Sequence, residues 1–114
     1  YKTQLDIDAE CDIRINAALY RGALLKVLVD GSEAGKIAFA PYELTVEKLK
    51  PGKHTVEYIL YGNRVNTFGS LHNCGKSSWV GPDHWYSKGD EWSYEYNLKP
   101  VGILKSPVIT VIKR

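Results

Sequence analysis

The strongest constraint on the fold is a strict alternation of apolar and polar side chains near the N-terminus. The apolar residues Cys11, Ile13, Ile15 and Ala17 alternate with the polar residues Asp12, Arg14 and Asn16. Successive side chains of a β-strand point to opposite faces, so a period of two buries one face and leaves the other in water. This segment is therefore predicted to be a half-buried strand.

Similar segments recur along the chain and are separated by turn residues. Further strands are predicted at 3–9, 24–29, 36–40, 55–61, 91–98 and 107–113. The run Lys50-Pro51-Gly52-Lys53 places Pro and Gly at the two central positions of a type II turn, where Gly supplies a positive φ. With about eight short strands and no helical crossovers, the expected fold is all-β, either an antiparallel two-sheet β-sandwich or a barrel.

Two segments do not follow the strand pattern. Residues Tyr42–Leu49 are the best helix candidate, and we expect one helical turn at most because Thr45 and Val46 are β-branched and Pro51 follows. Residues 63–90 are rich in glycine and tryptophan and lack a regular alternation. Long irregular segments on a rigid scaffold are where function tends to lie.

Composition limits the possible partners. The 15 Lys and Arg residues and 13 Asp and Glu residues are spread along the chain, which argues against nucleic-acid binding. The apolar runs are far shorter than the roughly 20 residues that cross a bilayer, so no membrane insertion is expected.

The 114 residues suit a single domain over 1–114. Because the chain has no Met and begins at Tyr1, we expect this domain to be excised from a longer polypeptide.

Two cysteines leave two alternatives open. Cys11 and Cys74 could form a disulfide, which would be worth about 4 kcal/mol if the geometry allowed it. The favoured alternative is that both are buried free thiols, which pack as small apolar side chains. The count of two does not reveal the cellular compartment.

Several sequence runs resemble one family. They are Val29-Asp30-Gly31-Ser32-Glu33-Ala34-Gly35, Ala40-Pro41-Tyr42-Glu43-Leu44, Leu49-Lys50-Pro51-Gly52-Lys53-His54-Thr55-Val56-Glu57 and Tyr61-Gly62-Asn63-Arg64-Val65-Asn66. They resemble the galactose-binding-like jelly-roll sandwiches found in bacterial glycoside hydrolases, from about Leu24 onward. Asp30 stands where that family more usually has Asn, and Lys53-His54 replaces its common Glu-Asn.

The resemblance implies a role as well as a fold. It implies a C-terminal accessory domain of a secreted or periplasmic glycan-degrading protein, whose partner is the catalytic domain of the same polypeptide. It supplies no catalytic residue, and the isolated domain is expected not to be an enzyme.

The residues themselves support no catalytic or metal site. Glycosidic cleavage needs two facing carboxylates, whereas Asp83, Asp90 and Glu91 are interpreted as solvated loop acids. An independent small hydrolase that uses these acids is therefore the least favoured hypothesis. The spacing of His72, Cys74 and His84 matches no closed zinc site, and neither a metal nor another cofactor is expected.

The best candidate ligand is a glycan. Sugar sites combine a flat aromatic face with planar polar groups that hydrogen-bond hydroxyls. The candidate residues are the aromatics Trp79, Trp85, Tyr86 and Trp92 and the polar residues Arg64, Asn66, His72, Asn73, Asp83 and His84. The favoured interpretation is that the aromatics pack the segment onto the sandwich or against a catalytic domain. The alternative is an autonomous carbohydrate-binding module that stacks sugar on Trp79, Trp85 or Trp92.

Overall fold

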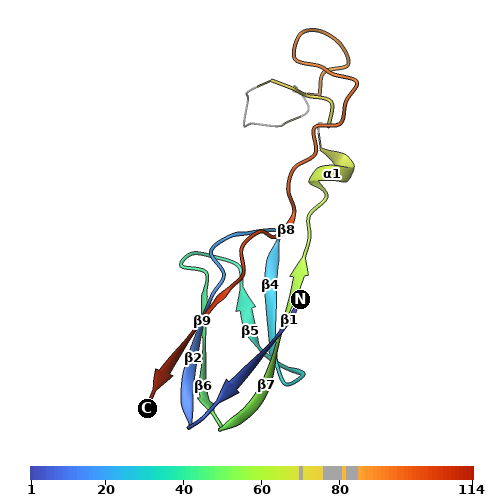
Figure 1. The fold of residues 1–114 in the computed structure, drawn as a ribbon. Helices are drawn as coiled ribbons and strands as arrows, with labels where there is room; N and C mark the ends of the chain where they lie inside the picture. The colour runs from blue at the N-terminus through green and yellow to red at the C-terminus, as the bar shows by residue number, and fades with distance from the viewer. Residues whose placement is uncertain (70, 76–80, 82–84) are drawn as a thin grey trace. The chain divides into compact units, whose positions relative to one another are not determined.

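The structure, a computed structural model, describes residues 1–69, 71–75, 81 and 85–114. It divides into two compact units (Figure 1). The first, here called the sandwich unit, consists of Tyr1–Gly62 and Val101–Arg114, and the second, the 63–100 unit, consists of Asn63–Pro100. A single domain over 1–114 remains a prediction.

The larger sheet of the sandwich unit has four antiparallel strands in the order β1-β7-β4-β5. Its strands are β1 (Lys2–Ile7), β4 (Leu24–Val29), β5 (Ser32–Ile37) and β7 (Gly52–Tyr61). Asp30 and Gly31 join β4 to β5 with φ angles of 51° and 82°. Two consecutive residues at positive φ form the tight hairpin turn whose twist matches that of the flanking strands.

The second sheet has three antiparallel strands in the order β6-β2-β9. They are β2 (Cys11–Asn16), β6 (Glu43–Leu49) and β9 (Val108–Lys113). A small third sheet pairs β3 (Tyr20–Arg21) with β8 (Gly102–Ile103). The alternation noted in the sequence is realised in β2, where Cys11, Ile13 and Ile15 are buried and the residues between them are not.

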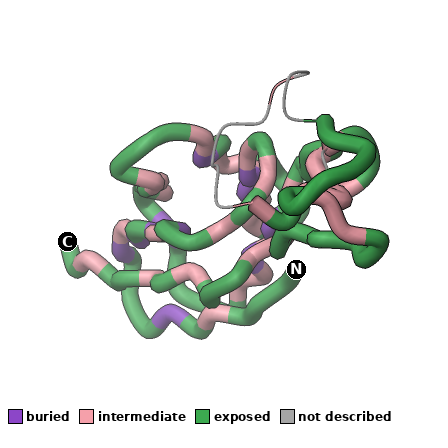
Figure 2. Tube along the Cα trace, turned by 90° about the horizontal axis from the view of Figure 1, so that it is seen from above, coloured by how far each residue is buried: buried purple, intermediate pink, exposed green. Residues whose placement is uncertain are grey.

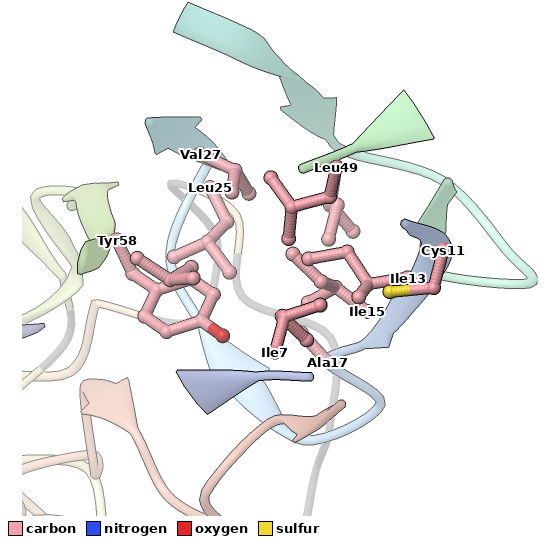
Figure 3. Packing of buried hydrophobic residues seen from close by; sticks show 11 residues of the cluster. Ile7, Cys11, Ile13, Ile15, Ala17, Leu25, Val27, Leu49 and Tyr58 are labelled. Atoms are coloured by element: carbon pink, nitrogen blue, oxygen red, sulfur yellow. The ribbon is translucent and has the colours of Figure 1, made fainter. Parts of the chain in front are cut away.

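The core lies between the two larger sheets. Its buried members are Ile7, Cys11, Ile13, Ile15, Ala17, Leu25, Val27, Ile37, Leu49, Val56 and Tyr58 (Figure 3). They come from every strand of both larger sheets except β9, which adds the partly buried Ile109. Each large apolar side chain removed from water contributes about 1.5–3 kcal/mol to folding, before the loss of conformational entropy is subtracted. This cluster therefore holds the two sheets together. The all-β antiparallel sandwich is thus confirmed.

Three secondary-structure predictions were wrong. The strand expected at 36–40 begins at Ser32 and ends at Ile37, because Asp30 and Gly31 alone make the reversal after β4. Residues 43–49 form strand β6 and not a helical turn, because Leu44 and Val46 pair with Ile15 and Ile13 of β2. This pairing exposes alternate residues and buries Leu49, a pattern that a helix could not produce. Residues 91–98 form no strand, since Trp92 makes a single isolated bridge to Asn73.

Both cysteines are free thiols. Cys11 is buried in the core of the sandwich unit, whereas Cys74 is exposed in the 63–100 unit. The disulfide alternative is therefore not realised in this structure. The buried Cys11 packs among apolar side chains, as the second alternative predicted, whereas the exposed Cys74 departs from that prediction.

The 63–100 unit differs from the sandwich unit in how little it buries. It contains the single helical turn α1 (Val65–Phe68). None of its described residues is buried, whereas the buried segments drawn purple in Figure 2 belong to the sandwich unit. Hydrogen bonds and exposed ring contacts, not a core, therefore give the described part of this unit its shape.

Candidate functional site

A short backbone ladder positions the aromatic residues of the 63–100 unit. The amide of Ser93 donates to the carbonyl of His72 at 2.8 Å, and the amide of Cys74 donates to the carbonyl of Glu91 at 2.9 Å. Asn73 bridges Trp92 between these two bonds. The ladder explains why residues so far apart in sequence present their side chains together.

Four rings gather along this ladder, and we call them the aromatic cluster: His72, Trp92, Tyr94 and Tyr96. The ring centre of His72 lies 5.5 Å from that of Trp92 and 4.9 Å from that of Tyr96. Trp92 meets Tyr94 edge to face at 4.5 Å. These separations fall in the range in which aromatic pairs attract one another. Trp92 is half-buried by its neighbours, while Tyr94 and Tyr96 are 86% and 68% exposed.

His72 is fixed within the cluster by a hydrogen bond. Its Nδ1 lies 2.8 Å from the carbonyl oxygen of Ser93. A carbonyl can only accept, so Nδ1 carries the hydrogen and donates. The bond orients the ring against Trp92 and Tyr96, which makes His72 a structural member of the cluster.

A groove of about 250 Å³ in the same unit holds the exposed Trp85. Its lining residues are Val65, Phe68, Gly69, Leu71, Trp85, Asn97 and Lys99. Phe68 and Trp85 are 62% and 58% exposed, which is unusual for rings of this size. The guanidinium carbon of Arg64 lies 5.5 Å from the centre of the Phe68 ring, a cation–π contact. The groove therefore offers flat apolar faces beside polar groups.

Asn66 holds one side of this groove in place. Its Nδ2 donates to the carbonyl of Lys99, and its Oδ1 accepts from the amide of Lys99, both at 2.8 Å. Asn97 makes a comparable link, because its Nδ2 donates to the carbonyl of Asn73 at 2.8 Å. These side-chain amides link backbone segments as strand pairing would. The amide of Asn66 is therefore engaged by the backbone and does not point to a ligand.

The structure thus divides the predicted glycan-binding residues. It brings His72, Asn73 and Trp92 together at the ladder, and it places Trp85 on the groove. Tyr86 is exposed and also engaged in an interaction. The predicted residues Trp79, Asp83 and His84 lie outside the described residues.

Sequence reasoning missed three aromatic residues of this unit. Phe68 lines the groove, and Tyr94 and Tyr96 belong to the aromatic cluster. The alternation of Trp92, Tyr94 and Tyr96 with Ser93 and Glu95 was a readable signal, because an extended segment places alternate residues on one side.

Two of the three acids considered for glycosidic cleavage, Asp90 and Glu91, lie in the described part of the 63–100 unit, and Asp83 lies outside the described residues. Asp90 and Glu91 are exposed neighbours whose backbone carbonyls accept from Cys74. Within the described residues, no group of three or more His, Cys, Asp or Glu side chains could hold a metal ion. No described helix has the length and apolarity to span a membrane.

Comparisons with known proteins bear on the fold. No protein-family model matches the sequence, and no curated protein matches it. Among solved structures, the chain is similar to the rhamnosidase from Novosphingobium sp. PP1Y, with a TM-score of 0.63 and 17% sequence identity. The match covers 96% of this chain and 10% of the rhamnosidase chain. This chain therefore shares its fold with one small part of a much larger protein.

Proposed function

We propose that this chain is a noncatalytic accessory domain of a larger glycan-degrading protein of the glycoside hydrolase type. The similarity to one tenth of a rhamnosidase supports the proposal, because a domain of that share would accompany a separate catalytic domain. The sequence runs that resemble accessory sandwiches of bacterial glycoside hydrolases support it independently. Such a protein would be secreted or periplasmic.

The observation that carries an accessory role is the exposure of aromatic rings in a unit whose described residues form no core. Phe68, Trp85, Tyr94 and Tyr96 are each more than half exposed, and no described residue of the 63–100 unit is buried. Exposed aromatic residues gathered on a surface usually mark a contact with another molecule. We propose that these rings contact the catalytic domain of the same polypeptide and stabilise it.

Deleting the domain from the full-length protein tests this function. Differential scanning calorimetry of the protein with and without these residues should show that the catalytic domain melts at a lower temperature after deletion. The isolated chain should hydrolyse no aryl glycoside. Unchanged melting and unchanged activity of the truncated protein would contradict the proposal.

A second candidate function is sugar binding at the groove, which the exposure of Trp85 favours. The apolar face of a pyranose could stack on this indole, with Asn97 and Lys99 beside it. The test is a calorimetric titration of the isolated chain with neutral mono- and disaccharides, including L-rhamnose. Trp85→Ala should abolish binding while Trp92→Phe preserves it, and the absence of heat at millimolar sugar would dismiss this candidate.

A further inference from the structure

The sandwich unit contains a second, larger pocket that the proposed function does not use. Its volume is about 610 Å³, and it lies between β1, Tyr58 of β7 and the segment 103–109. β1 is the end strand of the four-stranded sheet, and β9 is the end strand of the three-stranded sheet. The pocket therefore opens at the side of the sandwich where β1 and the segment entering β9 leave the core accessible.

Tyr58 provides an unpaired polar group at this pocket. Its side chain belongs to the core and is 4% exposed (Figure 3). The hydroxyl is buried and has no hydrogen-bond partner among the described residues. A buried hydroxyl without a partner costs about 1–3 kcal/mol, so native proteins seldom retain one without a reason. Because Tyr58 also lines the pocket, a ligand that displaces a neighbouring side chain there could reach this hydroxyl and satisfy it.

The rest of the lining combines polar groups with aliphatic surface. The polar groups are the side chains of Tyr1, Thr3, Gln4 and Ser106, and the aliphatic surface comes from Leu5, Ile103, Leu104, Pro107 and Ile109. This mixture suits a ligand that carries many hydroxyls on a carbon skeleton.

The charge of the lining has one sign. Lys2 and Lys105 line the pocket, and no Asp or Glu does. Lys2 lies 3.9 Å from Glu57 and is partly neutralised by it. Lys105 forms no ion pair with any described residue, so its ammonium is available to an anion. A single carboxylate on the ligand would match this charge.

We propose that this pocket binds a sugar that carries a carboxylate, such as a uronic acid. In this arrangement Lys105 pairs with the carboxylate, and the hydroxyl of Tyr58 hydrogen-bonds a sugar oxygen. The aliphatic residues contact the C–H groups of the ring. The choice of a sugar over another carboxylic acid rests on the proposed function, whereas the preference for an anion rests on the lining alone.

The experiment is a titration of ¹⁵N-labelled chain with three probes, followed by amide chemical shifts. Sodium D-galacturonate supplies the ring and the carboxylate, D-galactose supplies the ring alone, and sodium acetate supplies the carboxylate alone. We expect galacturonate to give saturable shifts at residues 2–5 and 103–106. Galactose and acetate should bind at least about tenfold more weakly, since each lacks one set of contacts.

Two pairs of variants locate the site. Tyr58→Phe removes only the unpaired hydroxyl and should weaken galacturonate binding about tenfold, whereas Tyr61→Phe on the same strand should not. Lys105→Gln should weaken it by a similar factor, with Lys53→Gln as the control. The chain should remain folded in each case, because no variant removes a partner from a buried group.

The outcomes separate the alternatives. Absence of saturable shifts with all three probes, as expected of a pocket that holds water alone, would overturn the proposal. Equal binding of acetate and galacturonate would overturn the assignment to a sugar, and equal binding of galactose would overturn the role of the carboxylate. Shifts confined to residues 65–69 and 97–99 would instead place the sugar in the groove. None of these results touches the accessory role, which the deletion experiment tests separately.

Discussion

Nδ1 of His54 lies 2.6 Å from Oδ2 of Asp30, which joins the hairpin turn after β4 to the first half of β7. The other ring nitrogen, Nε2, lies 2.7 Å from the carbonyl oxygen of Lys50. Both oxygens accept, so a charged ring that donates from both nitrogens fits this position best. The pair therefore ties the turn after β4 to β7 through a charge-assisted hydrogen bond.

The Asp30–His54 pair predicts a pH-dependent stability. Hydrogen bonds to Asp30 and then to the Lys50 carbonyl raise the pKa of His54 above its ordinary value of 6.5. The stabilisation by the charged ring is therefore complete below pH 6.5 and is lost as the pH rises through the raised pKa. Urea unfolding should give a larger free energy at pH 6 than at pH 9. His54→Gln should remove this difference, and an unchanged difference would contradict the assignment.

The acidic side of the same pair gives a second prediction. Hydrogen bonds from His54 and then from the Thr55 amide lower the pKa of Asp30 below its ordinary value of 3.8. The contribution of Asp30 is present above pH 3.8 and is lost as the pH falls through the lowered pKa. Asp30→Asn keeps an acceptor for Thr55 but removes the charge, so the pKa of His54 should fall in an NMR titration. Glu33→Gln, on β5, should leave that pKa unchanged.

Glycine at the start of β7 gives a third prediction. Gly52 has a φ of +133°, and a Cβ there would meet no atom. The cost of an alanine at this position would therefore come from its backbone conformation alone. Gly52→Ala should lower the free energy of unfolding by about 1–2 kcal/mol. Gly62→Ala is the matched control, because its site is equally open and its φ lies outside the left-handed region. Thermal unfolding measures both variants, and an equal loss of stability in the two would contradict this account.

The partly buried phenol of Tyr20 and the buried phenol of Tyr58 give a fourth prediction, in which the two substitutions have different effects on stability. The hydroxyl of Tyr20 donates to the carbonyl of Ile37 at 3.0 Å, whereas that of Tyr58 has no partner among the described residues. Tyr20→Phe should lower the free energy of unfolding by about 1 kcal/mol, and Tyr58→Phe should leave it unchanged or raise it. Denaturant unfolding without ligand measures both. A comparable loss in the two variants would mean that Tyr58 has a partner.

Strands were predicted correctly where the local alternation of apolar and polar residues agrees with the strand pairing seen in the structure. The alternation at 11–17 placed β2 to within one residue, and Pro51-Gly52 marked the turn before β7. Residues 43–49 were misassigned because their strand state depends on β2, some thirty residues earlier in the chain. The strand prediction for residues 91–98 was wrong for a different reason. This segment has the alternation of a strand, but it forms a single bridge, between Trp92 and Asn73.

The candidate site was predictable in composition but not in geometry. Trp85 and Trp92 were identified from their aromatic character, but the sequence could not assign one to a groove and the other to a ring cluster. The pair of Asp30 and His54 was also hidden, because Asp30 lies in the turn after β4, His54 lies on β7, and the two meet only when β4 pairs with β7. The pocket beside Tyr58 depends likewise on which strands end each sheet.

The most direct test of the accessory role is a comparison of Tyr94→Ala/Tyr96→Ala in the isolated chain and in the full-length protein. In the isolated chain these rings contact Trp92 and His72, so the change in its melting temperature measures what those contacts contribute to the 63–100 unit itself. In the full-length protein, the same change should lower the melting temperature of the catalytic domain, because we propose that the rings contact it. Phe39→Ala, which removes an 84% exposed ring from the sandwich unit, is the control and should have no effect in either protein. Equal melting of the full-length protein with and without the two tyrosines would contradict the account.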